Sequence, residues 1–509
     1  MRLATAAQSK EVDRISQAHF HISENQLMEA AGNSAAEHLL QSLQLSNAVD
    51  GEGIAFLVGP GNNGGDALVM VRYLQQRQIP CHVFAVGPHQ NRSPGFRSQW
   101  EKLGCPNFET LPEPGSRAAD ELLTRLAGFR ALVDGIFGVG LNRSLDPELC
   151  AWIAAWNRLP VLRFSVDIPT GLNADTGNPQ PVAFRADATC TFGLVKPGLL
   201  IREGQHFTGH LRCVDIGFPP KAVAEVARTH FALTRGVARR HLPQRTTLSH
   251  KASHGHVVVC AGGPGTWGAG VLCARAASRV GAGYITLAGS SAGTDLTDVL
   301  PEAMTSDWDP EKLDGRRAYA VGPGLGTGTQ TENILAALEE KRVPRVVLDA
   351  DALTVLARRP RRLPASWILT PHTGELARLL GTTAEAIEKN RWKALDTAVE
   401  LYGCVILLKG FRSLVASGER RILILSGNSA LAKGGSGDVL TGMISGMRAQ
   451  GLSAIEAVSL GSFLHGFIAD LWIQGHSDAA LMPSDLLLEI DQAWTVLVGE
   501  KNANRVKRS

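Results

Sequence analysis

Residues 434–438 read Gly-Gly-Ser-Gly-Asp, a set of residue types that could hold a phosphate beside a proton acceptor. An apolar run at 421–425 precedes them and an amphipathic segment at 439–447 follows, which predicts that they lie at the start of a helix. Glycines let the backbone approach a ligand closely because they lack a Cβ. The amides of 435–437 would bind phosphate oxygens at the positive end of the helix dipole, and Asp438 could accept a proton there. A glycine C-cap followed by an aspartate N-cap is the alternative, but a C-cap needs only one glycine.

A second glycine-rich loop lies at 59–66, Gly-Pro-Gly-Asn-Asn-Gly-Gly-Asp, directly after an apolar strand expected at 54–58. Its first six residues fit Gly-x-Gly-x-x-Gly, a pattern that is weak by itself. A dinucleotide site also needs an acidic residue at the end of the next strand, where it binds the ribose. The next strand ends at 85–89 as Ala-Val-Gly-Pro-His. The loop therefore predicts a phosphate cradle without the ribose contact of redox dinucleotide sites.

The elements around this loop predict an α/β unit. Residues 2–45 are expected to be helical, with a capping box formed by Ser23 and Gln26, and a further helix is expected at 67–76. The expected strands are 54–58, 81–86, 131–133, 161–166, 188–192 and 210–214. Short apolar strands that alternate with helices indicate a mostly parallel sheet covered on both faces.

Function collects at the carboxyl ends of the strands in such sheets. The polar residues expected there are Asn62, Asn63, Asp66, Asp134, Asp167, Thr170 and Lys196. Any one aspartate alone is better explained as a loop cap or an Asx-turn. Several of them at neighbouring strand ends predict a site.

Length and composition restrict the class of protein. A chain of 509 residues with 44% apolar residues predicts two or three domains with sizeable cores. The net charge of +3 gives no case for nucleic acid or an acidic membrane surface. The eight scattered cysteines never form Cys-x-x-Cys and are typical of a reducing compartment. Since the sequence shows no signal peptide and no apolar stretch long enough to cross a bilayer, we expect a soluble, cytoplasmic protein.

The second half predicts another α/β unit. We place domains at 1–225 and 226–500, followed by a basic tail at 501–509. A strand at 257–260 leads into Gly-Pro-Gly-Thr-Trp-Gly at 263–268, again without an acidic residue after the next strand. Further strand ends are expected within 321–328, 348–353, 369–375 and 407–413. Gly-Ser-Ser-Ala-Gly at 289–293 fits a nucleophile elbow, but the polar segment behind it predicts a turn. The absence of a Gly-Lys-[Ser/Thr] motif excludes a P-loop enzyme.

Four motifs of the first half resemble the NAD(P)H-hydrate epimerase family over roughly residues 5–220. They are Gly-Pro-Gly-Asn-Asn-Gly-Gly-Asp, Val-Asp-Gly-Ile-Phe-Gly-Val-Gly-Leu, Val-Asp-Ile-Pro-Thr-Gly-Leu and Phe-Gly-Leu-Val-Lys-Pro-Gly. The resemblance implies that the hydrated nucleotide binds to Asn62, Asn63, Gly64, Gly65, Asp66, Gly138, Val139, Gly140, Leu141, Asn142, Arg143, Ser144 and Asp167. It also implies a potassium ion held by Asn63, Asp134 and Thr170. Asp167 and Lys196 are our candidates for moving protons while C6 of the hydrated ring inverts, on charge and position only.

The second half resembles the ribokinase-like superfamily, and more closely its ADP-dependent NAD(P)H-hydrate dehydratase branch, over roughly residues 230–495. The resemblance implies that Ala269, Gly324, His372 and Asp438 bind the hydrated nucleotide. It implies that the adenine nucleotide binds to Lys409, Gly410, Phe411, Arg412, Ser413 and Gly437. Gly434, Gly435, Ser436 and Gly437 form the expected anion hole. Thr354 stands where the branch often has asparagine, a departure at that strand end.

Together the resemblances imply an α/β protein with a Rossmann-like three-layer sandwich followed by a ribokinase-like domain. The first domain is expected to interconvert the epimers of hydrated NADH or NADPH, with K⁺. The second is expected to dehydrate the S epimer with Mg²⁺ and with ADP as phosphoryl donor, releasing AMP and phosphate. The alternatives are a ribokinase-like small-molecule kinase and a first domain that only binds nucleotide. We expect small-molecule substrates, no nucleic-acid or membrane partner, and a homo-oligomer.

Overall fold

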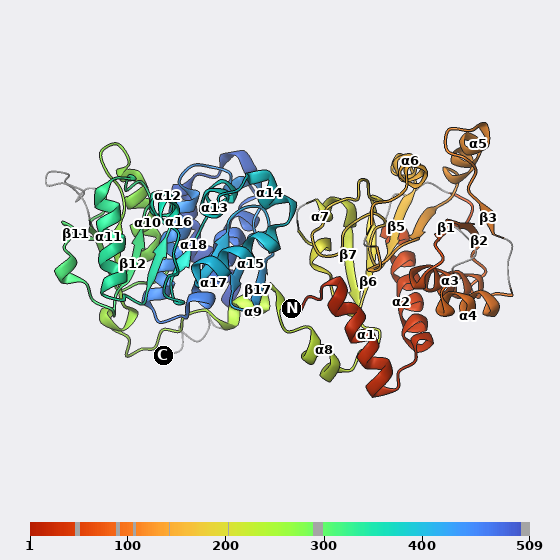
Figure 1. Cartoon of the computed structure of the whole chain (residues 1–509), viewed down its shortest axis with the longest axis horizontal. Coiled ribbons are helices and arrows are strands. Elements are labelled where there is room, and N and C mark those ends of the chain that lie inside the picture. Colours follow the sequence, from red (N-terminus) through yellow and green to blue (C-terminus); the bar gives the residue numbers. More distant parts are fainter. Residues whose placement is uncertain are drawn as a thin grey trace. The chain divides into compact units, whose positions relative to one another are not determined.

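The computed structural model describes residues 1–45, 51–87, 92–104, 108–141, 143–201, 203–288 and 299–499. The chain forms two compact units, one of Arg2–His230 and one of Phe231–Ser509 together with Met1 (Figure 1). The boundary placed at residue 225 in the sequence lies five residues before this division, within the helix α8 (Pro220–Val226). The tail at 501–509 and the turn proposed at 289–293 lie outside the described residues.

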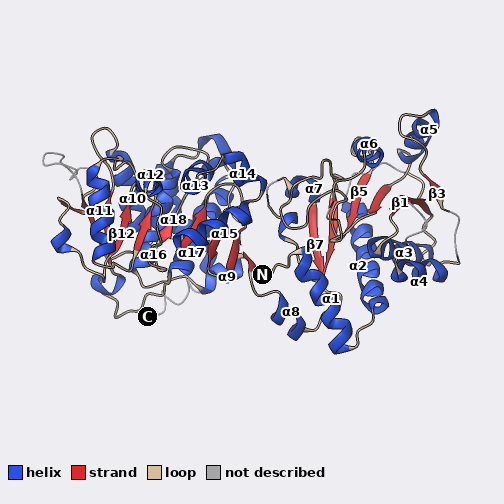
Figure 2. Cartoon of the chain, in the orientation of Figure 1, coloured by secondary structure: helices blue, strands red, loops and turns tan. Residues whose placement is uncertain are grey.

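The first unit contains a seven-stranded sheet in the order β3-β2-β1-β4-β5-β6-β7, with every pair parallel (Figure 2). The strands are β1 (Ile54–Val58), β2 (Cys81–Ala85), β3 (Glu109–Thr110), β4 (Ala131–Gly135), β5 (Leu162–Val166), β6 (Ala188–Phe192) and β7 (His210–Val214). The six strands predicted from the sequence are confirmed. The two-residue β3 is too short and too polar to show an apolar period.

Helices cover both faces of this sheet. They are α1 (Ala6–Phe20), α2 (Glu24–Leu45), α3 (Asn62–Gln75), α4 (Pro94–Lys102), α5 (Arg117–Leu126), α6 (Pro147–Trp156), α7 (Gly204–Thr208) and α8. Phe56 of β1 packs in one core with α2 and α3, whereas its neighbour Leu57 packs in a second core with α5 and α6. Successive residues of a strand point to opposite faces, so two cores explain why all of β1 is buried. The expected three-layer α/β sandwich is confirmed.

The helices confirm one prediction and correct another. Ser23 and Gln26 form the predicted capping box, because each backbone amide donates to the other's side chain. The helix predicted at 67–76 instead begins at Asn62, so the glycine loop enters the helix five residues earlier than expected. The first turn contains two glycines, whose poor helix propensity concealed it in the sequence.

The second unit contains a ten-stranded sheet in the order β11-β10-β9-β12-β13-β14-β15-β16-β17-β8. The strands are β8 (His230–Leu233), β9 (His256–Cys260), β10 (Tyr284–Ala288), β11 (Met304–Ser306), β12 (Ala318–Val321), β13 (Val346–Leu348), β14 (Ile368–Leu369), β15 (Val405–Leu408), β16 (Leu414–Ser417) and β17 (Arg420–Ile424). Pairing is parallel from β11 to β15 and antiparallel from β15 to β17. The carboxyl ends of β9, β12, β13, β14 and β15 therefore share one edge.

Its helices are α9 (Arg235–Arg240), α10 (Trp267–Arg279), α11 (Thr329–Glu340), α12 (Ala350–Arg358), α13 (Thr373–Leu380), α14 (Ala384–Lys389), α15 (Arg391–Tyr402), α16 (Ser436–Ala449), α17 (Ala454–Trp472) and α18 (Pro483–Val498). Val405 and Leu407 of β15 pack with α16, α17 and α18. Ile406 and Leu408 are equally buried and point to the other face, and α15 contacts β15 and β16. Both faces of this sheet are covered as well.

The helix α17 corrects one expectation from the sequence. Its 19 residues are long and apolar enough to cross a membrane by length and composition, which the sequence analysis did not anticipate. In the structure, 72% of that window is buried, and residues such as Leu464 and Ile468 belong to the core around α16. Burial of this kind is what a core helix shows.

Candidate active sites

The glycine loop of the first unit joins β1 to α3 at the point where the sheet order changes direction. The strands that follow β1 in the chain, β2 and β4, lie on opposite sides of it, and open parallel sheets bind ligands at such a switch point. A Cβ on Gly59 would lie 2.2 Å from the Ile136 carbonyl oxygen, and one on Gly64 would lie 1.9 Å from the Gly59 carbonyl oxygen. These two glycines are therefore required by close backbone packing.

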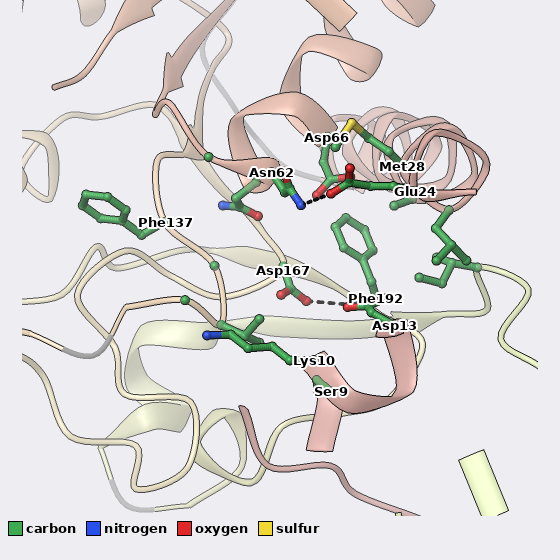
Figure 3. Close-up of a pocket in the computed structure, with 18 of the residues that line it drawn as sticks. Ser9, Lys10, Asp13, Glu24, Met28, Asn62, Asp66, Phe137, Asp167 and Phe192 are labelled. Carbon is green, nitrogen blue, oxygen red and sulfur yellow. Dashed lines mark hydrogen bonds between the residues drawn. The ribbon is translucent and has the colours of Figure 1, made fainter. Parts of the chain in front are cut away.

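A cavity of about 510 Å³ opens at this edge (Figure 3). The predicted site residues that line it are Asn62, Asn63, Asp66, Gly138, Val139, Gly140, Leu141, Arg143, Asp167 and Lys196. Gly64, Gly65 and Ser144 do not line it, and Asn142 lies outside the described residues. The helices α1 and α2 add charged side chains that the sequence analysis missed, namely Lys10, Asp13 and Glu24. The only signal in the sequence was a charged pair three residues apart, Lys10 and Asp13, which also fits a solvated helix face.

Asp167 and Lys196 form a buried ion pair in the wall of the cavity. The Lys196 Nζ donates to Asp167 Oδ1 at 2.6 Å, and also to Thr191 Oγ1 and the Phe192 carbonyl at 3.1 Å each. Asp167 Oδ1 further accepts from Thr191 Oγ1 and the Phe192 amide. Asp167 has φ +61°, a conformation that non-glycine residues seldom adopt and that concentrates at functional sites. Its Oδ2 faces the Gly138 turn, 3.4 Å from where a Cβ on that glycine would lie.

Asp134 and Thr170 meet next to this pair, and Asn63 Oδ1 lies 3.3 Å from where a Cβ on Gly138 would be. The Asp134 carboxylate accepts from the Thr170 amide at 2.7 Å and from Thr170 Oγ1 at 2.6 Å. Burial raises the pKa of Asp134 to about 6, although these hydrogen bonds act in the opposite direction. The buried Asn63 amide group has no hydrogen-bond partner among the described residues. Since buried polar groups are normally satisfied, the unfilled amide oxygen of Asn63 could accept a ligand such as a cation.

Two further carboxyl groups of the cavity have raised pKa values. Burial, with the Asp167 charge, raises the pKa of Asp66 well above its usual range. Burial and the Asp167 and Glu24 carboxylates raise the pKa of Asp13 to about 6, against the opposing effect of Lys196. Asn62 Nδ2 donates to Glu24, so part of its hydrogen-bonding capacity is used within the protein.

The second site lies at the N-terminus of α16, where the sequence predicted a phosphate cradle. Gly435 caps the helix with φ +95°, a conformation that favours glycine. A Cβ on Gly434 would meet nothing within 4 Å, so the loop leaves open space in front of the helix. Ser436 is buried, and its Oγ lies 3.2 Å from Nε2 of His465 on α17. Burial lowers the pKa of His465 to about 4, so this histidine is neutral and anchors the first turn of the helix.

A charged network joins this helix end to two strand ends. Asp349, which is 1% exposed, follows β13 and accepts from Lys409 Nζ at 2.6 Å and from Thr441 Oγ1 at 2.7 Å. The Glu375 Oε2 lies 3.7 Å from the same Lys409 Nζ. Burial lowers the pKa of Lys409, but Asp349 and Glu375 outweigh it and raise that pKa overall. Burial and the Asp349 charge raise the pKa of Asp438 to about 6, so its carboxylate can accept a proton near neutral pH.

The other predicted residues of the second unit are Ala269, Gly324, His372 and the turn Gly410–Ser413. A Cβ on Gly324 would lie 3.2 Å from the Ala269 Cβ, so these two form one wall. His372 caps α13 by accepting from the Gly374 amide, and its side chain is largely exposed. The Gly410–Ser413 turn is fixed locally, because Ser413 Oγ donates to the Gly410 carbonyl and the Arg412 guanidinium lies 5.1 Å from the centre of the Phe411 ring. The ring of Phe411 is half exposed.

The sequence analysis missed how the second site is held together. Asp349, Glu375 and Thr441 were within or next to the motifs, but no role was given to them. Lys409 and Asp349 are 60 residues apart in the chain and Thr441 is 92 residues from Asp349. Three separate elements must therefore dock before the network exists. Thr354, the departure noted in the sequence, accepts from Arg378 Nη1 at 2.9 Å.

Comparisons with known proteins agree with the two-unit organisation. Residues 257–492 match a family model described as NAD(P)H-hydrate dehydratase, and residues 24–198 match one described as YjeF-related protein N-terminus. The bifunctional NAD(P)H-hydrate repair enzyme Nnr of Moorella thermoacetica is 35% identical, over 96% of this chain and 95% of that protein. The enzyme of the same name from Thermofilum pendens is 32% identical over 98% and 97%.

A solved structure was also similar. The ADP/ATP-dependent NAD(P)H-hydrate dehydratase from Bacillus subtilis, co-crystallized with ATP/Mg²⁺, is 32% identical with a TM-score of 0.48 and covers 53% of this chain and 99% of that chain. The two motif sets, the two sheets with polar strand ends and the near full-length relatives agree. The chain belongs to the family of bifunctional NAD(P)H-hydrate repair enzymes.

Proposed function

We propose that the second unit dehydrates the S epimer of hydrated NADH or NADPH with ADP, and that the first unit interconverts the R and S epimers. The observation that carries this proposal is Asp438, a carboxyl group with a pKa raised to about 6 in the first turn of α16, beside an open glycine loop and the partly buried Lys409. A base next to a phosphate cradle supports transfer of a phosphoryl group to a hydroxyl.

Phosphorylation makes the dehydration possible because hydroxide is a poor leaving group. Asp438 takes the proton of the C6 hydroxyl, whose oxygen then attacks the terminal phosphorus of ADP and displaces AMP. The resulting phosphate leaves with the C6–O electron pair, assisted by the ring nitrogen. Loss of a proton from C5 then restores the dihydropyridine.

The anion hole stabilises the charge that develops on the transferring phosphate. We assign this role to the amides at Gly434, Gly435, Ser436 and Gly437, of which the last three belong to the N-terminal end of α16. Lys409 adds a positive charge, since its Nζ lies 3.5 Å from where a Cβ on Gly437 would be. Ala269, Gly324 and His372 are assigned to the hydrated nucleotide, and Lys409–Ser413 to the adenine nucleotide.

Mg²⁺ would be brought mainly by the phosphates of ADP. The described residues contain no cluster of three or more His, Cys, Asp or Glu side chains that could hold a metal. Protein sites for Mg²⁺ commonly add one or two carboxylates to substrate phosphates, and the buried Asp349 at this helix end fits that arrangement. When bound, the ion supplies neutralisation of phosphate charge.

In the first unit, Asp167 is the proposed proton acceptor. The Lys196 ammonium group donates to Asp167, Thr191 and the Phe192 carbonyl, which suits it to hold the Asp167 carboxylate in place. The hydrated nucleotide is assigned to the cavity lined by Asn62, Asn63, Asp66, Gly138, Val139, Gly140, Leu141, Arg143 and Asp167. K⁺ is assigned to Asn63, Asp134 and Thr170, because the unfilled amide of Asn63 supplies an oxygen ligand there. When bound, this ion would fix the position of the loop that carries Asn63.

An absorbance assay for restored reduced nicotinamide tests the proposal. Mixed epimers of hydrated NADH are supplied with ADP and Mg²⁺ to the wild type and to Asp438→Asn. Full recovery by the wild type, with the variant inactive in dehydration but still exchanging epimers, supports both assignments. Recovery of one epimer only would leave the dehydratase and reduce the first unit to a binding module. ADP consumption without recovery would favour a small-molecule kinase.

Sedimentation of the purified protein tests the expected homo-oligomer.

A further inference from the structure

The helix α1 places an unassigned carboxyl group, that of Asp13, in the cavity of the first unit (Figure 3). The start of α1 is held in place, because Thr5 forms a capping box with Gln8 and the Ala6 amide donates to Asp175 at 2.7 Å. Leu3 forms a parallel bridge with Val195, next to Lys196. The helix therefore starts beside the lysine that holds Asp167, and Asp13 follows on the next turns.

The cavity contains more carboxyl groups than buried cations. The charged and titratable groups that line it are Lys10 and Asp13 on α1, Glu24 on α2, Asp66 on α3, Arg143 in the loop after β4, Asp167 after β5, and Lys196 before the turn at Pro197–Leu199. Lys196 is nearly fully buried and pairs with Asp167, whereas Lys10 and Arg143 are exposed. The Asp167 carboxylate is thus the carboxyl group of the cavity that is paired with a buried cation.

The remaining carboxyl groups differ in how easily they can exchange a proton. Burial and the Asp167 charge raise the pKa of Asp66 well above its usual range. The pKa of Asp13 is raised only to about 6, so it can lose and regain a proton near neutral pH. A carboxyl group whose pKa lies near the working pH can both give and take a proton during a reaction.

We propose that Asp13 is a second catalytic residue of the epimerase site, which gives and takes a proton opposite Asp167; this inference rests on the proposed epimerase function. C6 of the hydrated ring carries both the hydroxyl oxygen and the ring nitrogen N1. Its configuration can invert by opening and closing the N1–C6 bond, without breaking a C–H bond and without any redox partner.

The step balances with two carboxyl groups. Asp167 takes the proton of the C6 hydroxyl, and the O–H electron pair becomes the second bond of a C6 aldehyde. The N1–C6 bond breaks, and its electron pair stays on N1, which receives the proton of Asp13. After rotation about C5–C6, N1 attacks the other face of the aldehyde. N1 then returns its proton to Asp13, and Asp167 returns a proton to the oxygen.

The test compares Asp13→Asn with Glu11→Gln, a control that removes the same charge from the solvent side of α1, where Glu11 pairs with Arg14. Exchange of purified R epimer into S epimer is followed by chromatography, with the uncatalysed rate subtracted. For Asp13→Asn we expect kcat to fall at least about 100-fold, the usual scale for loss of an acid–base group, with KM changed less than about threefold. Glu11→Gln should match the wild type.

The pH profile separates a proton-transferring role from a structural one. Asp13 must be protonated to donate, and its pKa is about 6, so the wild-type kcat/KM should fall about tenfold per pH unit above that value. The residual activity of Asp13→Asn should not show this fall above pH 6. Asp13→Glu should restore part of the rate and, with it, the fall above pH 6. Amide hydrogen exchange in the seven-stranded sheet checks that the first unit of each variant is folded, since dehydration reports only on the second unit.

The outcomes distinguish the role of Asp13 from the proposed epimerase function. A wild type that does not accelerate epimer exchange would overturn the proposed epimerase itself. The epimerase function is supported if the wild type and Glu11→Gln exchange epimers and Asp167→Asn does not. An Asp13→Asn variant that then keeps the wild-type rate and the wild-type pH profile would overturn only the role of Asp13.

Discussion

The two glycine-rich loops look alike in the sequence and serve different purposes in the structure. Between β1 and α3, Gly59 and Gly64 are glycines because backbone oxygens lie about where their Cβ atoms would be. Before α16, a Cβ on Gly434 would meet nothing. A close-packed glycine keeps the loop in shape, whereas an open one leaves room for a ligand.

The comparison shows that a glycine motif alone does not say where a ligand sits. In the first unit the cavity is formed mainly by residues after the motif and by α1 and α2, and of the glycines at 59, 61, 64 and 65 only Gly61 lines it. In the second unit Gly434 borders open space at the helix end. The proposed catalytic carboxyl groups differ in the same way. Asp438 directly follows its glycine loop, whereas Asp167 follows β5 and the glycine loop of that unit follows β1.

The largest expected effect is on catalysis by the second unit. Replacing the carboxylate in Asp438→Asn removes the base, so dehydration of the S epimer should slow by about 10²- to 10⁴-fold. Epimer exchange by the same chain should stay at the wild-type rate, because Asp438 belongs to the other unit. Stopped assays of both reactions on one preparation measure this, and a parallel loss of both activities would contradict separate sites.

The next effect is on the stability of the first unit. In Gly64→Ala the new methyl group meets the Gly59 carbonyl oxygen, and backbone must shift, so we expect a loss of more than about 3 kcal/mol in the free energy of unfolding of that unit. Denaturant unfolding followed by epimerase and dehydratase activity measures it unit by unit. Gly61→Ala is the matched control in the same loop, since its Cβ would meet nothing within 4 Å, and equal losses in both variants would refute the packing argument.

The third effect is a pH dependence of opposite sign in the two units. Asp438 must be ionised to accept a proton, and its pKa is raised to about 6, so kcat/KM for dehydration should rise about tenfold per pH unit below 6 and level off above it. Epimer exchange, which needs protonated Asp13, should fall above the same pH. Profiles that rise together would break the comparison between the two sites.

The smallest effect separates an open glycine from a packed one. Gly434→Ala should change the free energy of unfolding by no more than about 0.5 kcal/mol, because its methyl group meets no protein atom. The methyl group would instead enter the space proposed for phosphate, raising the KM for ADP by about three- to tenfold. Calorimetry and steady-state kinetics check the two parts, and a strongly destabilised protein with unchanged KM would show that this loop is packed after all.

Much of the fold was predictable because strands and helix starts depend on local pattern. All six strands expected in the first unit are present, as is the capping box at Ser23 and Gln26. The start of α3 was predicted five residues late, because glycine and asparagine are poor helix formers and only tertiary packing makes them helical. In α17 the apolar composition reflects burial in the core.

The sequence by itself determined which polar residues follow which strands, since apolar runs and turns are short-range features. That was enough to place Asp134, Asp167 and Lys409 at or next to the carboxyl ends of strands and Asp438 at the start of a helix. Only the tertiary structure decided that Asp349 and Thr441 meet 92 residues apart, and that α1 brings Asp13 to the cavity beside Asp167. Contacts of that kind depend on how whole elements dock, and no local period of the sequence encodes the docking.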